Sequence, residues 1–119
     1  MAAPVVHFEI MGGQGKQLEQ FYSQLFGWKI DSNNPMNYGM VERGEGGIPG
    51  GVGPEAAEMG DPGMRRVTVY AMVDDLQGTL DKAVSLGGKV VMPVSDVPGG
   101  PTLAMFADPS GNITGILKG

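Results

Sequence analysis

The chain contains no cysteine, only one histidine, and no apolar run close to the roughly 20 residues that cross a bilayer. Without cysteine there is neither a disulfide framework nor a thiol nucleophile, and a reducing cytoplasm is the expected compartment. The beginning of the sequence lacks the basic and apolar stretches of a secretory signal. The single histidine, His7, has no serine near it on its strand face, so a Ser-His-Asp triad is not supported. We therefore expect a cytoplasmic protein with no membrane partner.

Positive charge is also scarce. Eight Lys and Arg residues stand against 13 Asp and Glu, which gives a net charge of -5, and only Arg65 and Arg66 are adjacent. A polyanion would meet repulsion, so nucleic acid is not expected as a partner. The chain has 119 residues, of which 41% are hydrophobic, the size and composition of one compact globular domain.

The sequence contains an internal repeat. Residues 40–52 and 105–117 share the order of apolar strand, glycine-containing turn and apolar strand, at an offset of 65. A repeat of this size predicts two similar supersecondary units that share one core. We expect one domain over residues 1–119, with module one at about 4–53, a linker at about 54–65 and module two at about 66–118.

Hydrophobic periodicity and turn residues predict the order strand, helix and three strands in each module. Each helix carries an apolar stripe: Leu18, Phe21, Tyr22 and Leu25 in the first, and Leu76, Leu80, Ala83 and Val84 in the second. Asp74 or Asp75 can cap the second helix. The expected strands cover residues 5–10, 28–30, 37–42, 47–52, 67–73, 89–92, 103–107 and 113–117, and the helices run from about 16 to 26 and from about 75 to 86.

Strand alternation assigns the side chains to the two faces of the sheet. In the first strand Val6, Phe8 and Ile10 form the apolar set that faces a helix, and His7 and Glu9 point the other way. In the fifth strand the helix-facing set is expected to be Val67, Val69, Ala71 and Val73, opposite Thr68, Tyr70 and Met72. A face that carries His, Glu, Thr, Tyr and Met indicates the lining of a cleft.

Four segments together resemble the vicinal oxygen chelate superfamily, which includes glyoxalase I, bleomycin-resistance proteins and extradiol dioxygenases. These segments are Val-Val-His-Phe-Glu-Ile at 5–10, Phe-Tyr-Ser-Gln-Leu-Phe-Gly-Trp-Lys-Ile at 21–30, Val-Asp-Asp-Leu at 73–76 and Asp-Pro-Ser-Gly-Asn at 108–112. The resemblance implies an α+β fold of two tandem βαβββ modules, whose curved eight-stranded sheet surrounds a central cleft with the helices on the outer face. It also implies a homodimer.

Metal-using members of that superfamily hold their ion through four positions of the repeat. By resemblance these positions fall on His7, Gly50, Thr68 and Gly115, so only one ligand is kept. One imidazole cannot hold a divalent metal tightly. Glu9 lies two residues beyond His7 on the same face, and donors from a partner chain would be needed to complete a site.

His7 and Glu9 are the candidate catalytic residues, with Glu9 as a general base or as the partner of a basic side chain. Six further residues can line the cleft for a small organic ligand or simply fill space between the modules: Trp28, Met40, Thr68, Tyr70, Met72 and Met105.

The preferred interpretation is a small-molecule-binding protein of the glyoxalase or bleomycin-resistance kind, with no cofactor and no tightly bound metal. The alternative is a metal-dependent lyase or isomerase that uses His7, Glu9 and residues of a partner chain. A partner-binding scaffold without a ligand is the third hypothesis.

Overall fold

A computed structural model describes residues 2–13, 15–54 and 65–119 and has an α+β fold, as the sequence predicts. The predicted linker lies almost entirely outside the described residues. The elements, in chain order, are β1 (Val5–Met11), α1 (Gly15–Phe26), β2 (Ile30–Asp31), β3 (Gly39–Val41), β4 (Gly50–Gly53), β5 (Arg66–Val73), α2 (Leu76–Ser85), β6 (Lys89–Asp96), β7 (Thr102–Ala107) and β8 (Ile113–Lys118).

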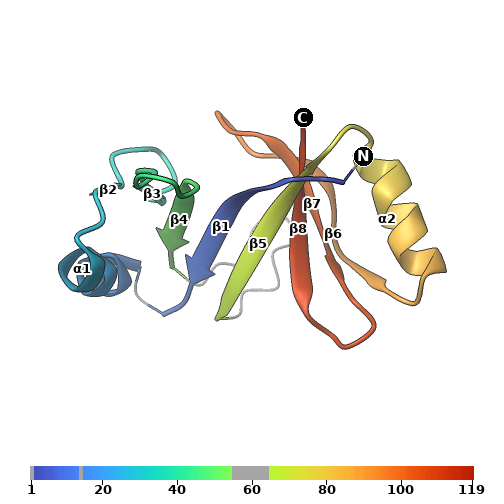
Figure 1. Ribbon diagram of the computed structural model, residues 1–119, viewed down its shortest axis with the longest axis horizontal. Coiled ribbons are helices and arrows are strands. Elements are labelled where there is room, and N and C mark those ends of the chain that lie inside the picture. Colours follow the sequence, from blue (N-terminus) through green and yellow to red (C-terminus); the bar gives the residue numbers. More distant parts are fainter. Residues whose placement is uncertain (1, 14, 55–64) are drawn as a thin grey trace.

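All eight strands form one curved mixed sheet in the order β2-β3-β4-β1-β5-β8-β7-β6 (Figure 1). β1 and β5 pair antiparallel in the middle, while β1–β4 and β5–β8 are parallel pairs. Each half of the sheet therefore consists of the strands of one module. We call the sheet face that carries α1 and α2 the outer face, and the opposite one the inner face.

The second helix packs as its sequence predicts. The Asp75 carboxylate accepts a hydrogen bond from the Gly78 amide at 2.9 Å and caps the first turn of α2. Leu76 and Leu80 are buried against Ala104 of β7 and Ile116 of β8. This cluster forms the core between α2 and the outer face.

The first helix does not bury the stripe that was expected to face the core. Phe21 and Leu25 are each 58% exposed. The buried positions of α1 are Gly15 and Glu19, one turn apart, and the helix packs against β4. At Gly15 a Cβ would lie only 2.7 Å from the Pro54 nitrogen, so the helix approaches the chain closely along this line. The other two residues of the stripe, Leu18 and Tyr22, are half-buried.

The central strands are also more open than predicted. Ala71 and Val73 of β5 pack against the α2 cluster, as expected. Val67 and Val69 lie on the same outer face but are exposed, because α1 packs mainly on β4 and α2 on β6, β7 and β8. The prediction that they pack beneath a helix is therefore wrong.

No helix within the described ranges is long and apolar enough to cross a membrane.

Candidate functional site

Glu9 lies at the centre of the inner face, where the two modules meet. It is 8% exposed and accepts three hydrogen bonds. The hydroxyl of Tyr70 and the guanidinium Nη2 of Arg66 donate to Oε1, each at 2.9 Å, and the hydroxyl of Tyr38 donates to Oε2 at 2.9 Å. Arg66 therefore forms a buried ion pair with Glu9.

His7 extends this network by one more bond. Its Nε2 lies 3.0 Å from the Tyr38 hydroxyl oxygen. Because the single hydroxyl hydrogen of Tyr38 goes to Glu9, the imidazole donates through Nε2–H. The His7 ring also meets the Tyr70 ring edge to face, with centroids 5.5 Å apart. We call His7, Glu9, Tyr38, Arg66 and Tyr70 the Glu9 cluster.

The environment fixes the protonation of three members of this cluster. Burial lowers the pKa of His7 below its usual value, and the nearby Glu9 charge opposes that shift only in part. Burial, together with the Glu9 carboxylate, raises the pKa values of Tyr38 and Tyr70 well above the ordinary tyrosine value. At neutral pH the cluster thus contains a neutral imidazole and two phenols that remain hydrogen-bond donors.

Glycines make room for the two tyrosine rings. A Cβ at Gly51 would overlap the Tyr38 ring, and one at Gly115 would overlap the Tyr70 ring. Strand register pairs Glu9 with Gly51, whereas Gly50 pairs with Phe8 and faces the outer side. Gly50, to which the resemblance assigns a ligand position, therefore faces away from Glu9, and Gly51 is the glycine of β4 on the inner face.

The donors of this face do not fit a tightly held divalent cation. Both Glu9 oxygens and the His7 Nε2 already bond to side chains of the chain itself. The glycines at the carboxylate positions contribute no side-chain oxygen, and the Thr68 hydroxyl, which lies opposite Glu9, is a poor ligand. Across the described residues no three His, Asp or Glu side chains gather in one place.

The remaining predicted lining residues lie in three environments: a buried cluster on the inner face, exposed positions on the inner face, and the outer face. Tyr70 and Met105 are buried in one inner-face cluster with Met92 and Leu103. Met40 and Met72 are exposed at 51% and 39%.

Trp28 lies on the outer face, away from the Glu9 cluster. Its ring centroid is 5.3 Å from that of Phe8, and it stacks on Tyr22 at 5.4 Å.

Sequence reasoning missed Tyr38 and Arg66. The alternation of the fifth strand contained a signal for Arg66, because Arg66 precedes Thr68 by two residues and so shares its face. Tyr38 had no such signal, since it lies just before β3 and reaches Glu9 through its side chain.

A hollow of about 380 Å³ opens in module one along β2, β3 and the segment before β4, and no member of the Glu9 cluster lines it. Its wall includes Met40, which pairs with Gly51 and so lies on the inner face. Pro49, also in the wall, accepts a hydrogen bond from the Phe8 amide and thus lies beside His7 of β1. The full lining is Lys29, Ile30, Asp31, Met40, Val41, Glu42, Arg43 and Pro49.

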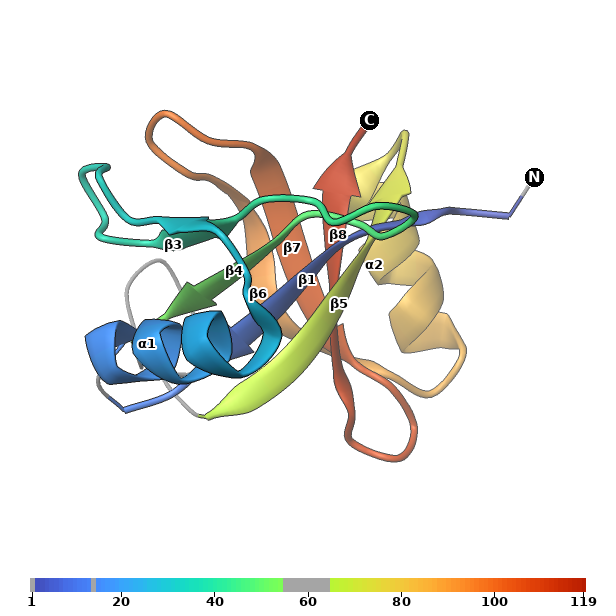
Figure 2. The ribbon, with the colours of Figure 1, turned by 60° about the vertical axis from the view of Figure 1, so that its left-hand side comes forward.

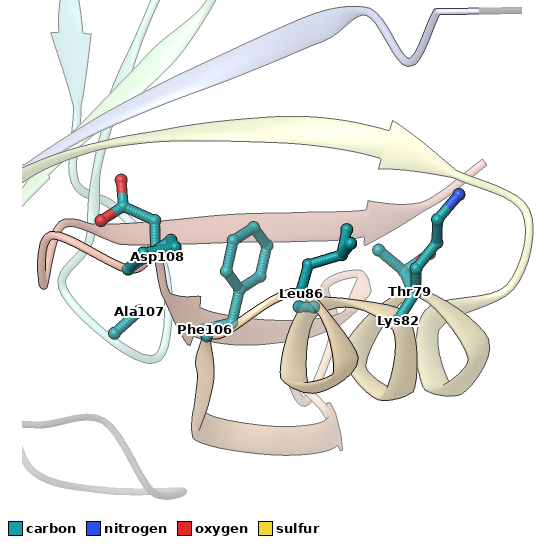
Figure 3. A pocket seen from close by; sticks show the side chains of 9 residues that line it. Thr79, Lys82, Leu86, Phe106, Ala107 and Asp108 are labelled. Atoms are coloured by element: carbon teal, nitrogen blue, oxygen red, sulfur yellow. The ribbon is translucent and has the colours of Figure 1, made fainter.

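A second hollow of about 270 Å³ lies between α2 and the end of β7 (Figure 3). Phe106 and Leu86 project into it, while Lys82 and Asp108 stand at opposite ends. The Asp108 carboxylate accepts hydrogen bonds from Asn112 and from the Ser110 amide, which lower its pKa. This carboxylate is committed to the turn, and none of the predicted site residues lines the hollow.

Comparison with known proteins gives the same picture of the fold. The model of the glyoxalase-like domain family matches residues 13–116. The chain is 32% identical over 105 residues to proteins named "Putative glyoxylase CFP32" from Mycobacterium bovis and Mycobacterium tuberculosis. The match covers 84% of this chain and 40% of those relatives, so the chain spans less than half of their length.

Solved structures resemble the chain at low sequence identity. A structure described as an NAD-dependent benzaldehyde dehydrogenase from Legionella pneumophila superposes with a TM-score of 0.68 at 14% identity, over 94% of this chain and 96% of that one. A methylmalonyl-CoA epimerase from Mycobacterium tuberculosis gives 0.64 at 11% identity, over 96% and 86%. At these identities the likeness shows the fold.

Proposed function

We propose, because this chain belongs to the glyoxalase-like domain family of the vicinal oxygen chelate superfamily, that it binds a small organic molecule on the inner face. The ligand would occupy the hollow beside Met40 and reach toward His7. No tightly bound metal ion takes part in this proposal.

The observation that carries the proposal is the position of the hollow. Its volume of about 380 Å³ falls in the range of small-molecule sites, which is roughly 300–1,000 Å³. Met40 of its wall lies on the inner face, and Pro49 of its wall accepts a hydrogen bond from the Phe8 amide, next to His7. The thioether of Met40 supplies an adaptable apolar contact, and two cationic and two acidic residues of the lining supply polar contacts: Lys29, Arg43, Asp31 and Glu42.

The ion pair explains how Glu9 is stabilised without a metal. The Arg66 guanidinium balances the Glu9 charge, and the two phenols donate one further hydrogen bond to each carboxylate oxygen. A buried carboxylate is costly unless it is paired and hydrogen-bonded in this way. The Glu9 cluster would then serve as a rigid polar border of the ligand site.

The alternative of a metal-dependent lyase or isomerase requires a rearrangement of this network. His7 and Glu9 would have to release Tyr38 and Arg66 before binding an ion, and further donors would have to come from a partner chain. Zinc analysis of protein purified without chelator tests this alternative. A stoichiometric metal that is lost in His7→Ala would favour the enzyme.

The binding proposal is tested by saturation-transfer NMR against a panel of small organic acids, ketones and aromatic compounds. We expect at least one specific ligand, and we expect Met40→Ala to weaken its binding about tenfold through lost apolar contact. Val84→Ala on α2 is the matched control, because Val84 is also 51% exposed but lies away from the hollow. Equal weakening by both variants, or no binding across the panel, would argue against the proposed site.

A further inference from the structure

The hollow between α2 and the end of β7, which we call the α2 hollow, shares no residue with the hollow beside Met40. α1 packs on β4, whereas α2 packs on β6, β7 and β8, so the two helices cover different halves of the sheet (Figure 2). The volume of the α2 hollow is about 270 Å³, slightly below the roughly 300–1,000 Å³ of sites for drug-sized molecules. It therefore has room for a molecule with one ring.

The walls of the α2 hollow are mainly apolar. Phe106 and Leu86 project into it (Figure 3), and Ala83, Ala107 and Pro109 complete the apolar lining. Leu86 is 67% exposed, and Phe106 is only partly buried at the margin of the cluster beneath α2. Both side chains thus keep apolar surface that a ligand can remove from water, and a ligand ring can lie against the Phe106 ring.

Most polar groups around the α2 hollow already have partners within the chain. The Thr79 hydroxyl donates a hydrogen bond to the Asp75 carbonyl at 2.7 Å. Carbonyl groups in the last turn of α2 accept hydrogen bonds from the amides of Leu86 and Gly88. The Asp108 carboxylate accepts hydrogen bonds within its own turn. These groups therefore leave little for a polar ligand to bind.

Lys82 is the exception. In the part of the chain that the structure describes, its ammonium group has no hydrogen-bond or ion-pair partner. Lys82 stands at one end of the α2 hollow and Asp108 at the other (Figure 3), so an anionic group is attracted to the Lys82 end and repelled from the Asp108 end. One cationic group beside an apolar wall is complementary to a molecule that carries one negative charge on an apolar body.

We propose that the α2 hollow binds a small organic carboxylate that carries one aromatic ring. The Lys82 ammonium pairs with the carboxylate, and the ring lies against Leu86 and Phe106. The ammonium is required because Lys82 lies in the last turn of α2, where the helix dipole alone would repel an anion. This site lies on the outer face and does not depend on the function proposed for the inner face.

An NMR titration with phenylacetate tests the proposal. The methyl signals of Leu86 report on the α2 hollow, and the methyl signal of Met40 reports on the other hollow. We expect a saturable shift at Leu86. Phenylacetamide has nearly the same shape without the charge, and acetate has the charge without the ring, so each should bind at least about tenfold more weakly. No saturable shift at Leu86, or equally tight binding of phenylacetamide, would overturn the proposal.

Substitutions of Lys82 locate the charge. Lys82→Met removes the ammonium but keeps most of the apolar stem, so we expect it to weaken phenylacetate binding at least about tenfold, whereas Lys82→Arg should stay within about threefold of the parent chain. Lys89→Met is the matched control, because Lys89 is also exposed but does not line the hollow. Both lysines are exposed, so the variants should keep the thermal stability of the parent chain. Equal binding by Lys82→Met and Lys89→Met would contradict the assignment of Lys82.

Discussion

The two helices occupy equivalent places in the repeat but pack very differently. α2 buries Leu76 and Leu80 almost completely against its own half of the sheet, whereas α1 leaves Phe21 and Leu25 more than half exposed. The strands beneath them explain the difference. β6, β7 and β8 contain six to eight residues each, while β2, β3 and β4 contain two to four.

Module one thus has little sheet on which a helix can bury an apolar stripe. Three of the four residues of β4 are glycine, and the space at Gly50 and Gly51 is occupied by the rings of Phe8 and Tyr38. Module two provides the larger part of the core, and module one provides the hollow and most of the Glu9 cluster. The comparison indicates that module two carries most of the packed core, whereas module one carries the hollow at which we propose ligand binding on the inner face.

Removing the Glu9 carboxylate should have the largest effect, because the cluster joins the two modules. We predict that Glu9→Ala lowers the free energy of unfolding by about 3–5 kcal/mol, since it deprives the Arg66 guanidinium of its paired charge. Urea unfolding measures the change. A loss below about 1 kcal/mol would mean that the cluster contributes little to the contact between the modules.

The difference between the helices can be measured with one leucine from each. We predict that Leu80→Ala lowers the free energy of unfolding by about 3 kcal/mol, because apolar burial is lost and a cavity remains. Leu25→Ala should cost less than about 0.5 kcal/mol within one protomer, because this side chain is already largely in solvent. The comparison should be made at concentrations where the chain is monomeric, and similar losses in the two variants would contradict it.

The glycine of β4 can be tested against a glycine in open space. A Cβ at Gly51 would overlap the Tyr38 ring, so we predict that Gly51→Ala costs about 1–3 kcal/mol and displaces that ring from Glu9. Gly44→Ala is the control, because nothing lies within 4 Å of its Cβ position. In a chain that already carries Tyr38→Ala, Gly51→Ala should destabilise the fold less than it does in the parent chain. An equal loss of stability in both chains would show that the Tyr38 ring is not the obstacle.

The smallest effect should come from protonation of His7. Because burial lowers the pKa of His7 in the folded chain, the unfolded chain binds more protons between that value and about 6.5. The contribution of neutral His7 to the free energy of unfolding should therefore be fully present above this pH window. It should be lost as the pH drops through the window. Thermal unfolding at pH 7.5 and at pH 5 measures the fall, and His7→Gln should remove the His7 part of it.

The sequence predicts the large-scale structure well because periodicity reports secondary structure directly. The order of ten elements, the capping role of Asp75 and the pairing of His7, Glu9, Thr68 and Tyr70 on one face all follow from alternation and turn residues. Residues 37–42 form a shorter strand than predicted, partly because Asn37 adopts a left-handed φ of 51°.

The rest depends on how the elements meet, which a pattern does not contain. The stripe of α1 is equally apolar whether it faces the sheet or solvent, and the sequence does not show that the helix instead buries Gly15 and Glu19. The face of Gly50 is decided by the register between β1 and β4. Trp28 lies outside a regular strand, so no alternation places it on the outer face.

Because His7 is the only histidine, its imidazole gives a unique NMR signal at the border of the proposed site. The most direct measurement follows the ring ¹⁵N and ¹³C shifts of His7 while Zn²⁺, and separately an organic ligand from the panel, is added at neutral pH. We predict that the ligand shifts the signal to saturation and that stoichiometric Zn²⁺ leaves it at the position of the neutral, Nε2-protonated ring. A zinc-bound imidazole signal at one equivalent would contradict the claim that the chain's own donors stand in place of a metal.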